Sequence, residues 1–398
     1  MPSDHHTEQE ATSRPHGRLG ELARLFLRLG TTAFGGPAAH LAMMEDEVVR
    51  RRAWMSSQEF LDLIAVTNLI PGPNSSEMAI HIGYRRAGWR GLLIAGTCFT
   101  FPAFVIVFGL AWLYVRYHTL PVASGMLRGV QPVIIAIIVQ ALWRLGRTAI
   151  KTRTLAVLAL ASVGLGLAGV HELIVLFAAA FAMVATHAIR ARTRTHAGGG
   201  GTLRSIAPLL VGSGTVSSLL GSGTAPVGLG LLFLFFLKVG SVLYGSGYVL
   251  IAFLRADLVE RWGWLTESQL LDAIAVGQVT PGPLFTTATF IGFLLAGPWG
   301  AVVSTGGMFL PAFVFVAASA PLVPRLRKSA LASAVLDGLN VGSLALMVAV
   351  TFFLARSTLV DVTTWALAAG SLVLLLWLRL NSTWLVAAGF VLGVLFFQ

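Results

Sequence analysis

Long apolar stretches separated by short polar loops fill most of this chain. In lipid a long apolar run must be helical, because a helix satisfies its own backbone polar groups. One crossing takes about 20 residues, so the pattern predicts an all-α, polytopic helical bundle with about ten to thirteen membrane segments. The strong apolar segments cover residues 20–44, 59–83, 91–115, 119–143, 154–170, 172–189, 226–251, 267–294, 299–322, 330–354, 362–378 and 383–398.

The composition excludes a soluble protein. Of the 398 residues, 56% are hydrophobic and 11% are charged, whereas soluble domains carry about 25% charged residues. The mean hydropathy is +0.80. The formal net charge of +11 would suggest nucleic acid in a soluble protein, but in a polytopic protein cationic side chains collect in cytoplasmic loops. We therefore expect a multi-pass membrane protein with no nucleic-acid partner.

The chain divides into four parts. Residues 1–18 are polar and are predicted to form a disordered cytoplasmic tail. Residues 19–189 and 226–398 hold the two sets of apolar segments. Between them, residues 190–225 carry four consecutive glycines and a weak apolar stretch, a composition that predicts a flexible linker.

The two apolar halves are repeats of each other. Residues 27–73 align with 237–283 at a constant offset of 210, and 15 of these 47 positions are identical. Both stretches end in Pro-Gly-Pro, and both are followed by a Pro-Ala-Phe-Val string, at 102–105 and 311–314. Chance similarity in composition would not place both strings in the same order and spacing. We infer two homologous membrane repeats.

Cationic residues indicate how the halves are oriented. The loop at 84–91 carries Arg85, Arg86 and Arg90, whereas its counterpart at 293–300 carries no Lys or Arg. Because Lys and Arg collect in cytoplasmic loops, the repeats are predicted to have inverted topology, a recurrent plan among secondary transporters. The block at 50–52 fits neither side cleanly, so the first segments of each repeat are candidates for re-entrant structure.

The two Pro-Gly-Pro strings predict broken helices. Proline removes a backbone donor and glycine adds freedom, so each string should interrupt a helix near the middle of the bilayer. A new helix start leaves free N–H groups and a partial positive charge that suit an anion. A proline kink that only serves packing is the alternative. We predict breaks at Pro71, Gly72, Pro73, Pro281, Gly282 and Pro283, and substrate contacts at Asn74, Ser75, Ser76, Thr286 and Thr287.

A second pair of breaks is expected nearer the start of each repeat. Arg28 and Lys238, which are repeat partners, precede these breaks in apolar surroundings. An intramembrane cation is costly and is a functional candidate by default, so both are predicted to contact the anion. The alternative is that both snorkel to the interface near a helix end. The residues of the breaks that could contact substrate are Gly35, Gly36, Pro37, Gly245 and Ser246.

Glu77 and His81 lie four residues apart and share one face of a helix. Neither has an ionisable counterpart in the second half. A carboxylate and an imidazole on one face could relay protons, which makes them candidates for proton coupling. The alternatives are a first-turn carboxylate near a helix start and a neutral packing histidine.

Other charged positions have structural explanations. The acidic residues 45–47 beside the arginines 50–52 are expected to form a solvated, self-paired loop. Residues 56–59 and 266–269 match the capping-box pattern of a helix start. Asp62 and Asp272, about a turn inside those helices, could pair with the cations or cap the helix.

The chain contains no Walker loop, nucleophile elbow, HExxH zinc site or CxxC pair. No enzymatic activity, cofactor or metal site is therefore expected, and any transport must run on gradients. A membrane-embedded enzyme acting on a phosphorylated lipid, with Glu77 and His81 as acid and base, is the alternative from another class. The lack of a second catalytic carboxylate beside them counts against it.

Several motifs together resemble the chromate ion transporter family of the long-chain, two-domain type. The resemblance covers both halves outside the first 18 residues and the linker. One departure is Leu284-Phe285, which stands where the first half has Asn74-Ser75, so the two sites are not expected to bind equally. The motifs are FGGPAAH at 34–40, WMS at 54–56, NLIPGPNS at 68–75, IGYR at 82–85, FPAF at 101–104, KVG at 238–240, YGSGY at 244–248 and VTPGP at 279–283.

The resemblance implies a two-domain protein of the inner (cytoplasmic) membrane that exports chromate and confers chromate resistance, with sulfate as a chemical look-alike and competitor. The membrane potential or a proton gradient would drive this export. Sulfate or another oxyanion as the true cargo and a passive anion channel are the alternatives. The expected partners are chromate and the lipid bilayer, and a homodimer is left open.

Overall fold

The structure, a computed structural model, describes residues 15–33, 36–118, 121–195, 227–244, 247–320, 330–378, 380 and 382–396. All regular structure within these ranges is helical, as the apolar pattern predicted. Most of the predicted tail, up to residue 14, and the linker from residue 196 onward lie outside the described residues.

The two repeats have closely similar successions of helices. The first contains α1 (Pro15–Thr32), α2 (Pro37–Glu45), the π-helix η1 (Asp46–Arg51), α3 (Ser57–Thr67), α4 (Asn74–Tyr117), α5 (Pro121–Ala149), α6 (Arg153–Leu167) and α7 (Glu172–Thr195). The second contains α9 (Leu229–Val242), η2 (Gly247–Val249), α10 (Leu250–Leu254), the π-helix η3 (Arg255–Arg261), α11 (Glu267–Val279), η4 (Leu284–Thr286), α12 (Thr287–Ser319), α14 (Ala330–Thr358), α15 (Val362–Trp377) and α16 (Ser382–Phe396).

The first repeat begins with two helical hairpins that open toward one surface. One consists of α1 and the α2–η1 pair, and the other consists of α3 and the first arm of α4. Arg85, in the first arm of α4, pairs with Glu59 in the first turn of α3, with Nη2 and Oε1 3.1 Å apart. Arg86 pairs with Glu21 of α1 and also lies over the ring of Trp54, which follows η1. The outer ends of all four arms therefore meet at one surface, and the non-helical tips between α1 and α2 and between α3 and α4 point inward.

Helix α4 folds back on itself at Gly88. This residue has φ +60°, in the left-handed region that favours glycine. The two arms cross so closely that a Cβ added at Gly83 would lie 2.6 Å from the Cβ of Ala95. The same bend recurs in α12 at Gly297, with nearly the same backbone angles.

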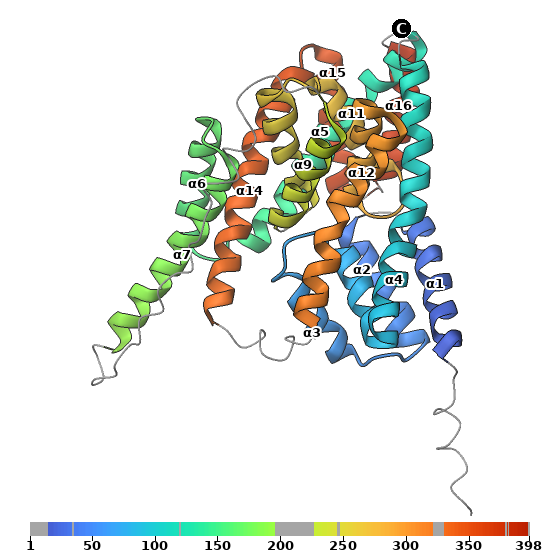
Figure 1. The fold of residues 1–398 in the computed structure, drawn as a ribbon. Helices are drawn as coiled ribbons and strands as arrows, with labels where there is room; N and C mark the ends of the chain where they lie inside the picture. The colour runs from blue at the N-terminus through green and yellow to red at the C-terminus, as the bar shows by residue number, and fades with distance from the viewer. Residues whose placement is uncertain are drawn as a thin grey trace, which may run out of the picture.

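The second repeat is inverted relative to the first. In Figure 1, α1, α2 and α3 occupy the lower part of the molecule, whereas α9 and α11 lie higher. The long second arm of α4 rises in that view, and the second arm of α12 descends. Helix α1 packs on α4, α9 packs on α12, and α4 packs on α12 where the repeats meet. The fold is thus the predicted helical bundle of two inverted repeats with broken helices.

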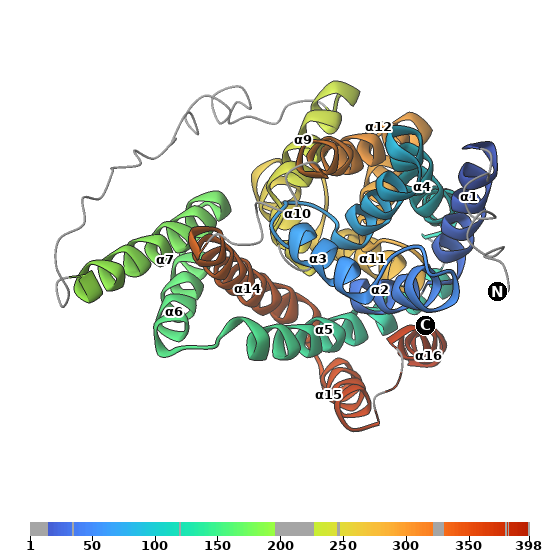
Figure 2. The same ribbon diagram turned by 90° about the horizontal axis from the view of Figure 1, so that it is seen from below.

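The outer helices are exchanged between the repeats. Helices α6 and α7 pack on α14, whereas α15 and α16 pack on α5. Figure 2 shows both groups beside the central helices α1–α4 and α9–α12. Glycines lie at these contacts, with Gly129 of α5 against Gly389 of α16 and Gly338 of α14 against Ala179 of α7. Small residues let membrane helices approach closely.

Four helices within the described ranges are long and apolar enough to cross a membrane, and five shorter apolar helices accompany them. The first two apolar segments of each repeat, which the sequence left open as re-entrant, do not form single straight helices. Four of the predicted segments each hold both arms of a hairpin, because the break in the middle turns the chain back. These are the segments 20–44, 59–83, 226–251 and 267–294.

This folding explains the arginine block at 50–52. The guanidinium groups of Arg52 and Arg86 both lie over the ring of Trp54, at 5.2 and 4.9 Å from its centroid. The block therefore shares a surface with the cation-rich loop at 84–91. The positive-inside rule predicts that this surface, the lower one in Figure 1, faces the cytoplasm.

Candidate functional site

Both Pro-Gly-Pro strings form the non-helical tip of a hairpin. The string at 71–73 separates α3 from α4, and the string at 281–283 separates α11 from η4. Gly72 has φ +138° and Gly282 has φ +92°, a range that a side chain with a Cβ rarely adopts. Glycine is therefore the residue that lets the chain turn at each tip.

Two equivalent hydrogen bonds join the tips of one repeat to those of the other. The N–H of Gly72 donates to the carbonyl of Leu243, after α9, with N and O 2.7 Å apart. The N–H of Gly282 donates to the carbonyl of Ala33, after α1, at 3.0 Å. Ala33 and Leu243 are themselves separated by the repeat offset of 210. Four hairpin tips thus meet between the repeats in the centre of the molecule.

The start of α4 offers buried polar groups at this centre. A helix start leaves its first N–H groups without intrahelical partners, and no side chain caps α4. Ser75 and Ser76 are buried, and Ser76 Oγ has no hydrogen-bond partner among the described residues. Asn74 Nδ2 donates to Asn68 Oδ1 at 2.8 Å. Amide and hydroxyl donors of this kind suit an oxyanion.

At the start of the equivalent helix in the second repeat, the polar side chains already have hydrogen-bond partners within the same turn. Thr286 and Thr287 are both buried. Their hydroxyls donate to the carbonyls of Pro283 and Leu284, each at 2.8 Å. The two predicted half-sites therefore differ, as the replacement of Asn-Ser by Leu-Phe suggested.

The second pair of predicted breaks is partly described. Helix α2 starts at Pro37, and Gly36 before it has φ +79° without a side-chain cap. His40 Nε2 lies 3.1 Å from the carbonyl of Ala33 and so bridges this tip. Gly35, Gly245 and Ser246 lie outside the described residues.

A line of three ionisable side chains runs along the first arm of α4. Glu77 is fully buried beside Gly72, and neither carboxyl oxygen has a hydrogen-bond partner within the described ranges. His81 is buried one turn further along, and its Nε2 is likewise unpartnered there. Arg85 follows after another turn, at the cytoplasmic surface. Residues four apart share a helix face, so the line spans about 12 Å from tip to surface.

The cations Arg28 and Lys238 are held by carboxylates of the π-helices. Lys238 Nζ lies 2.6 Å from Asp257 Oδ2, and both side chains are largely buried. Arg28 pairs with Glu47, but its side chain is 49% exposed. The two ion pairs occupy equivalent places in the repeats. A direct contact of either cation with an anion stays a prediction, and the exposure of Arg28 fits the snorkelling alternative.

The expected pairing of the acidic residues 45–47 with the arginines 50–52 is confirmed, but the expectation that they form a solvated loop was wrong. Glu47 is buried in η1 and also accepts hydrogen bonds from Arg51 and Arg52, at 3.3 and 3.2 Å. The reason is the hairpin, which brings Glu47 back against α1 and its Arg28.

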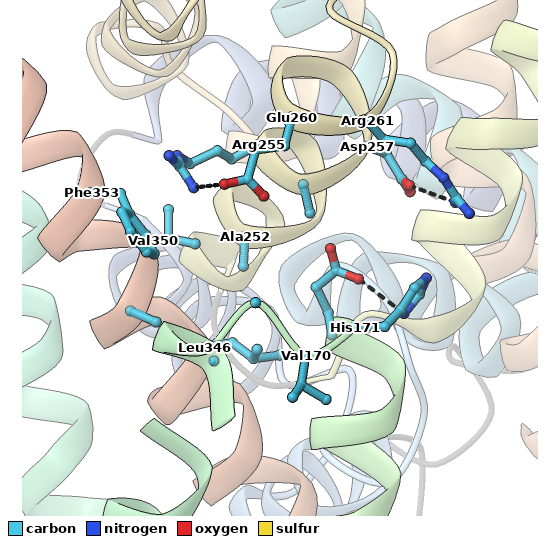
Figure 3. A pocket seen from close by; sticks show the side chains of 15 residues that line it. Val170, His171, Ala252, Arg255, Asp257, Glu260, Arg261, Leu346, Val350 and Phe353 are labelled. Carbon is cyan, nitrogen blue, oxygen red and sulfur yellow. Dashed lines mark hydrogen bonds and ion pairs between the residues drawn. The ribbon is translucent and has the colours of Figure 1, made fainter. Parts of the chain in front are cut away.

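A charged cavity of about 320 Å³ lies between the α6–α7 connection, η3 and α14. Figure 3 shows Arg255 paired with Glu260 and Arg261 paired with Asp257 along η3. Burial lowers the pKa of His171, which disfavours its charged form. Because its arginines are matched by carboxylates, this cavity has no preference for an anion.

Sequence reasoning missed a buried bridge between the repeats. Asp272 of α11 accepts hydrogen bonds from Tyr114 Oη of α4 at 2.9 Å and from Gln131 Nε2 of α5 at 3.1 Å. His118 stacks on Tyr114 with ring centroids 4.9 Å apart. The acid inside an apolar helix was a visible signal, but its partners come from the other repeat. Among the described residues no three His, Cys, Asp or Glu side chains are grouped for a metal ion.

Inverted repeats whose broken helices meet at the centre define the class of this chain as a multi-pass membrane transporter. The chain belongs to the chromate transporter family, whose sequence profile matches residues 20–184 and 230–394.

Two relatives show how far the similarity extends. The chain is 30% identical over 390 residues to the chromate transport protein of Cupriavidus metallidurans, covering 98% of this chain and 96% of the relative. It is 35% identical over 352 residues to the chromate transport protein of Pseudomonas aeruginosa, covering 85% and 81%. No solved structure matches this chain.

Proposed function

We propose that this protein exports chromate across the cytoplasmic membrane and thereby confers chromate resistance. The observation that carries the proposal is the meeting of inverted hairpin tips around the start of α4, where buried amide and hydroxyl donors gather. Convergent donors of this kind match the oxygens of a tetrahedral dianion. The names of the relatives supply the cargo, chromate.

The membrane potential supports this direction. Moving one charge through 100 mV is worth about 2.3 kcal/mol, so a dianion that leaves a negative cytoplasm gains about 4.6 kcal/mol per 100 mV. Access would alternate as one repeat rocks against the other. The hydrogen bonds at Gly72 and Gly282 link the repeats and would be the pivot of this motion.

Glu77 and His81 are the groups we assign to proton coupling. A fully buried carboxylate without a partner is costly when ionised, so Glu77 is expected to carry a proton in this conformation. Loss of that proton would place a negative charge beside the substrate amides at the tip. A proton on Glu77 and a bound anion would therefore favour each other, which is the basis of coupled movement of a proton together with the anion.

Uptake of labelled chromate into everted vesicles tests the proposal. With an imposed potential, positive inside, vesicles containing the protein should accumulate chromate, and vesicles without it should not. No uptake under an intact potential would overturn the proposal, and stronger competition by sulfate than by chromate at equal concentration would reassign the cargo.

The coupling assignment has its own test in the same vesicles. Glu77→Gln should flatten the pH dependence of transport, whereas Glu77→Asp, which keeps a titratable carboxyl group, should retain it. An unchanged profile in Glu77→Gln would remove Glu77 from the coupling mechanism.

A further inference from the structure

Helices α3 and α11 are repeat equivalents, but the outer helices cover only α11. Helix α11 packs on α5 and α16 in addition to α12, whereas α3 packs mainly on α4. Leu271 and Ala275 of α11 are each 1% exposed. Their equivalents at the offset of 210 are Leu61, which is 57% exposed, and Ala65, which is also exposed. One face of the repeat is therefore buried in the second copy and open in the first.

Two polar contacts hold the outer helices against the second repeat. Gln131 Nε2 of α5 donates to Asp272 Oδ1 of α11 at 3.1 Å and to Ser268 Oγ at 2.7 Å. The guanidinium of Arg255, in η3, lies over the ring of Phe353 of α14, 4.4 Å from its centroid (Figure 3). Because the repeats are inverted, both contacts lie on the side of the molecule opposite η1. This side is closed in the structure.

The first contact has a counterpart in the first repeat that is not formed. Helix α14 begins and ends 209 residues after α5, and this offset makes Asn340 of α14 the equivalent of Gln131. The offset of 210 makes Asp62 of α3 the equivalent of Asp272. A carboxamide and a carboxylate are thus present in both copies. In the structure Asn340 is exposed, and Asp62 accepts a hydrogen bond from Gln58 of its own helix at 2.9 Å.

The second contact has a counterpart with opposite charges. Glu45 stands where the second repeat has Arg255, and Arg144 of α5 stands where it has Phe353. Arg144 is exposed, and Glu45 lies 3.7 Å from Arg50. A carboxylate and a guanidinium attract each other, so an approach of α5 to the junction of α2 and η1 would be favourable. The uncovered side thus has matched groups for the same two contacts.

We propose that the open face of α3 is a docking surface for α14 of the same chain in the opposite state of the transport cycle. In that state Asn340 donates to Asp62, and Arg144 of α5 pairs with Glu45. The contacts of α5 with α11 and of α14 with η3 open in exchange. Alternating access between inverted repeats requires such an exchange, because one side closes as the other opens.

The assignment of these contacts to a transport cycle rests on the proposed function, whereas the contacts themselves rest on the repeat. By the positive-inside rule, the structure is the state that is open toward the cytoplasm. A face of α3 that always lies against lipid is the outcome that the experiments below must separate from docking of α14.

Thiol cross-linking of the full chain in proteoliposomes tests the docking without any substrate. In a Cys98→Ser background, Asp62→Cys with Asn340→Cys should be joined by a short, membrane-permeant bifunctional methanethiosulfonate. Asp62→Cys with Phe352→Cys is the matched control, because Phe352 is also exposed but lies about three turns further along α14. Cross-linking of the first pair at the level of the control would overturn the proposal.

Weakening the closed side should favour the opposite state. Gln131→Ala removes the donor of the contact with α11 and should raise the rate of cross-linking between positions 62 and 340 by up to about tenfold, the ratio that corresponds to about 1.4 kcal/mol. Asp272→Asn weakens the same contact from the other helix and should act in the same direction. No increase in either variant would overturn the proposal.

Single cysteines follow the exchange without altering the contacts themselves. In the Gln131→Ala and Asp272→Asn variants, Ala275→Cys should react faster with N-ethylmaleimide and Ala65→Cys should react more slowly. Misfolding would raise both rates, so a reciprocal change supports the exchange. An unchanged rate at Ala65→Cys in both variants would make this face a permanent lipid contact and overturn the proposal.

Exchange of charges tests the second contact. Arg144→Glu should lower the cross-linking between positions 62 and 340, and addition of Glu45→Arg should restore it. Arg147→Glu is the control, because Arg147 is exposed at the same end of α5 and should leave the cross-linking unchanged. A loss that the second substitution does not restore would overturn the pairing of Arg144 with Glu45 in the proposed state.

Chromate uptake separates this proposal from the proposed function. A cross-link between positions 62 and 340 should stop uptake, and reduction of its disulfides should restore it. Reciprocal exchange in a protein that takes up no chromate would support the docking of α14 and remove chromate as the cargo. Full uptake by the cross-linked protein would overturn the docking as a step of the cycle.

Discussion

Substitution of Gly282 by alanine probes the meeting of the hairpin tips most directly. The residue has φ +92°, and an added Cβ would lie 2.7 Å from the Cβ of Ala103 in the other repeat. Holding alanine in such a conformation costs about 1–3 kcal/mol. Forcing a methyl group into a filled space adds about 1–3 kcal/mol. We therefore expect Gly282→Ala to lower the free energy of unfolding by about 2–6 kcal/mol, the sum of the two effects.

Two companion variants separate these effects. Gly297→Ala also places alanine at positive φ, +65°, but its Cβ would meet no atom within 4 Å, so only the backbone cost of about 1–3 kcal/mol is expected. In the double variant, Ala103→Gly removes the methyl group that Gly282→Ala would strike. The double variant should recover about 1–3 kcal/mol relative to the sum of the single variants.

Unfolding in mixed detergent micelles, followed by tryptophan fluorescence, measures the four free energies, and chromate uptake is followed in parallel. Recovery of stability together with transport would place the two repeats in contact at this point. Strict additivity of the two single variants, or equal effects of Gly282→Ala and Gly297→Ala, would refute the packing described here.

Three other predictions follow from the ion pairs, the inversion and the helix starts. Lys238→Ala removes the nearer of the two cations that pair with the buried Asp257 and leaves only Arg261, at 3.2 Å. It should destabilise the protein by about 3 kcal/mol, the lower end for a broken buried pair, whereas Arg28→Ala, at a half-exposed pair, should cost about 1 kcal/mol or less. Thermal unfolding in detergent would distinguish the two variants, and equal costs would contradict the difference in burial of the two ion pairs. With the single Cys98 replaced by serine, Trp89→Cys should react with an impermeant maleimide from the cytoplasmic side and Trp299→Cys from the opposite side, and reaction of both from one side would exclude the inverted arrangement. Ser56→Ala removes the side chain that accepts from the Glu59 backbone N–H at 3.2 Å and should lower the free energy of unfolding by about 1 kcal/mol, with Ser57→Ala, next in the chain, as the control.

Much of the fold could be predicted from local sequence patterns. The capping boxes at 56–59 and 266–269 are formed as their spacing predicted, and the Pro-Gly-Pro strings interrupt helices where proline and glycine chemistry requires. These features depend on a few neighbouring residues, so the sequence contains all the information that they need.

Features that depend on contacts distant in the chain could not be predicted. An apolar segment with a break has the same sequence pattern whether the chain passes through the membrane or turns back. The ion pair of Arg85 with Glu59, 26 residues away, decides for the hairpin. Likewise, the carboxylate that holds Lys238 is Asp257, and the partners of Asp272 lie in the other repeat. The inversion of the repeats could be predicted because it depends on the number of Lys and Arg residues in whole loops and not on single contacts.

The backbone is nearly symmetric between the repeats, but the side chains along the first arms of α4 and α12 are not. The first arm of α4 carries Glu77, whereas the register of 209 places Thr286 at the equivalent position in the second repeat. The next turns show the same loss, from His81 to Phe290 and from Arg85 to a leucine. Equal backbones allow the repeats to exchange conformations at little cost, since each state resembles the other turned over. Under the proposed proton coupling, a titratable path in the first repeat alone would make the two states unequal for a charged substrate, while the gradients of substrate, protons and potential would set the direction of net transport.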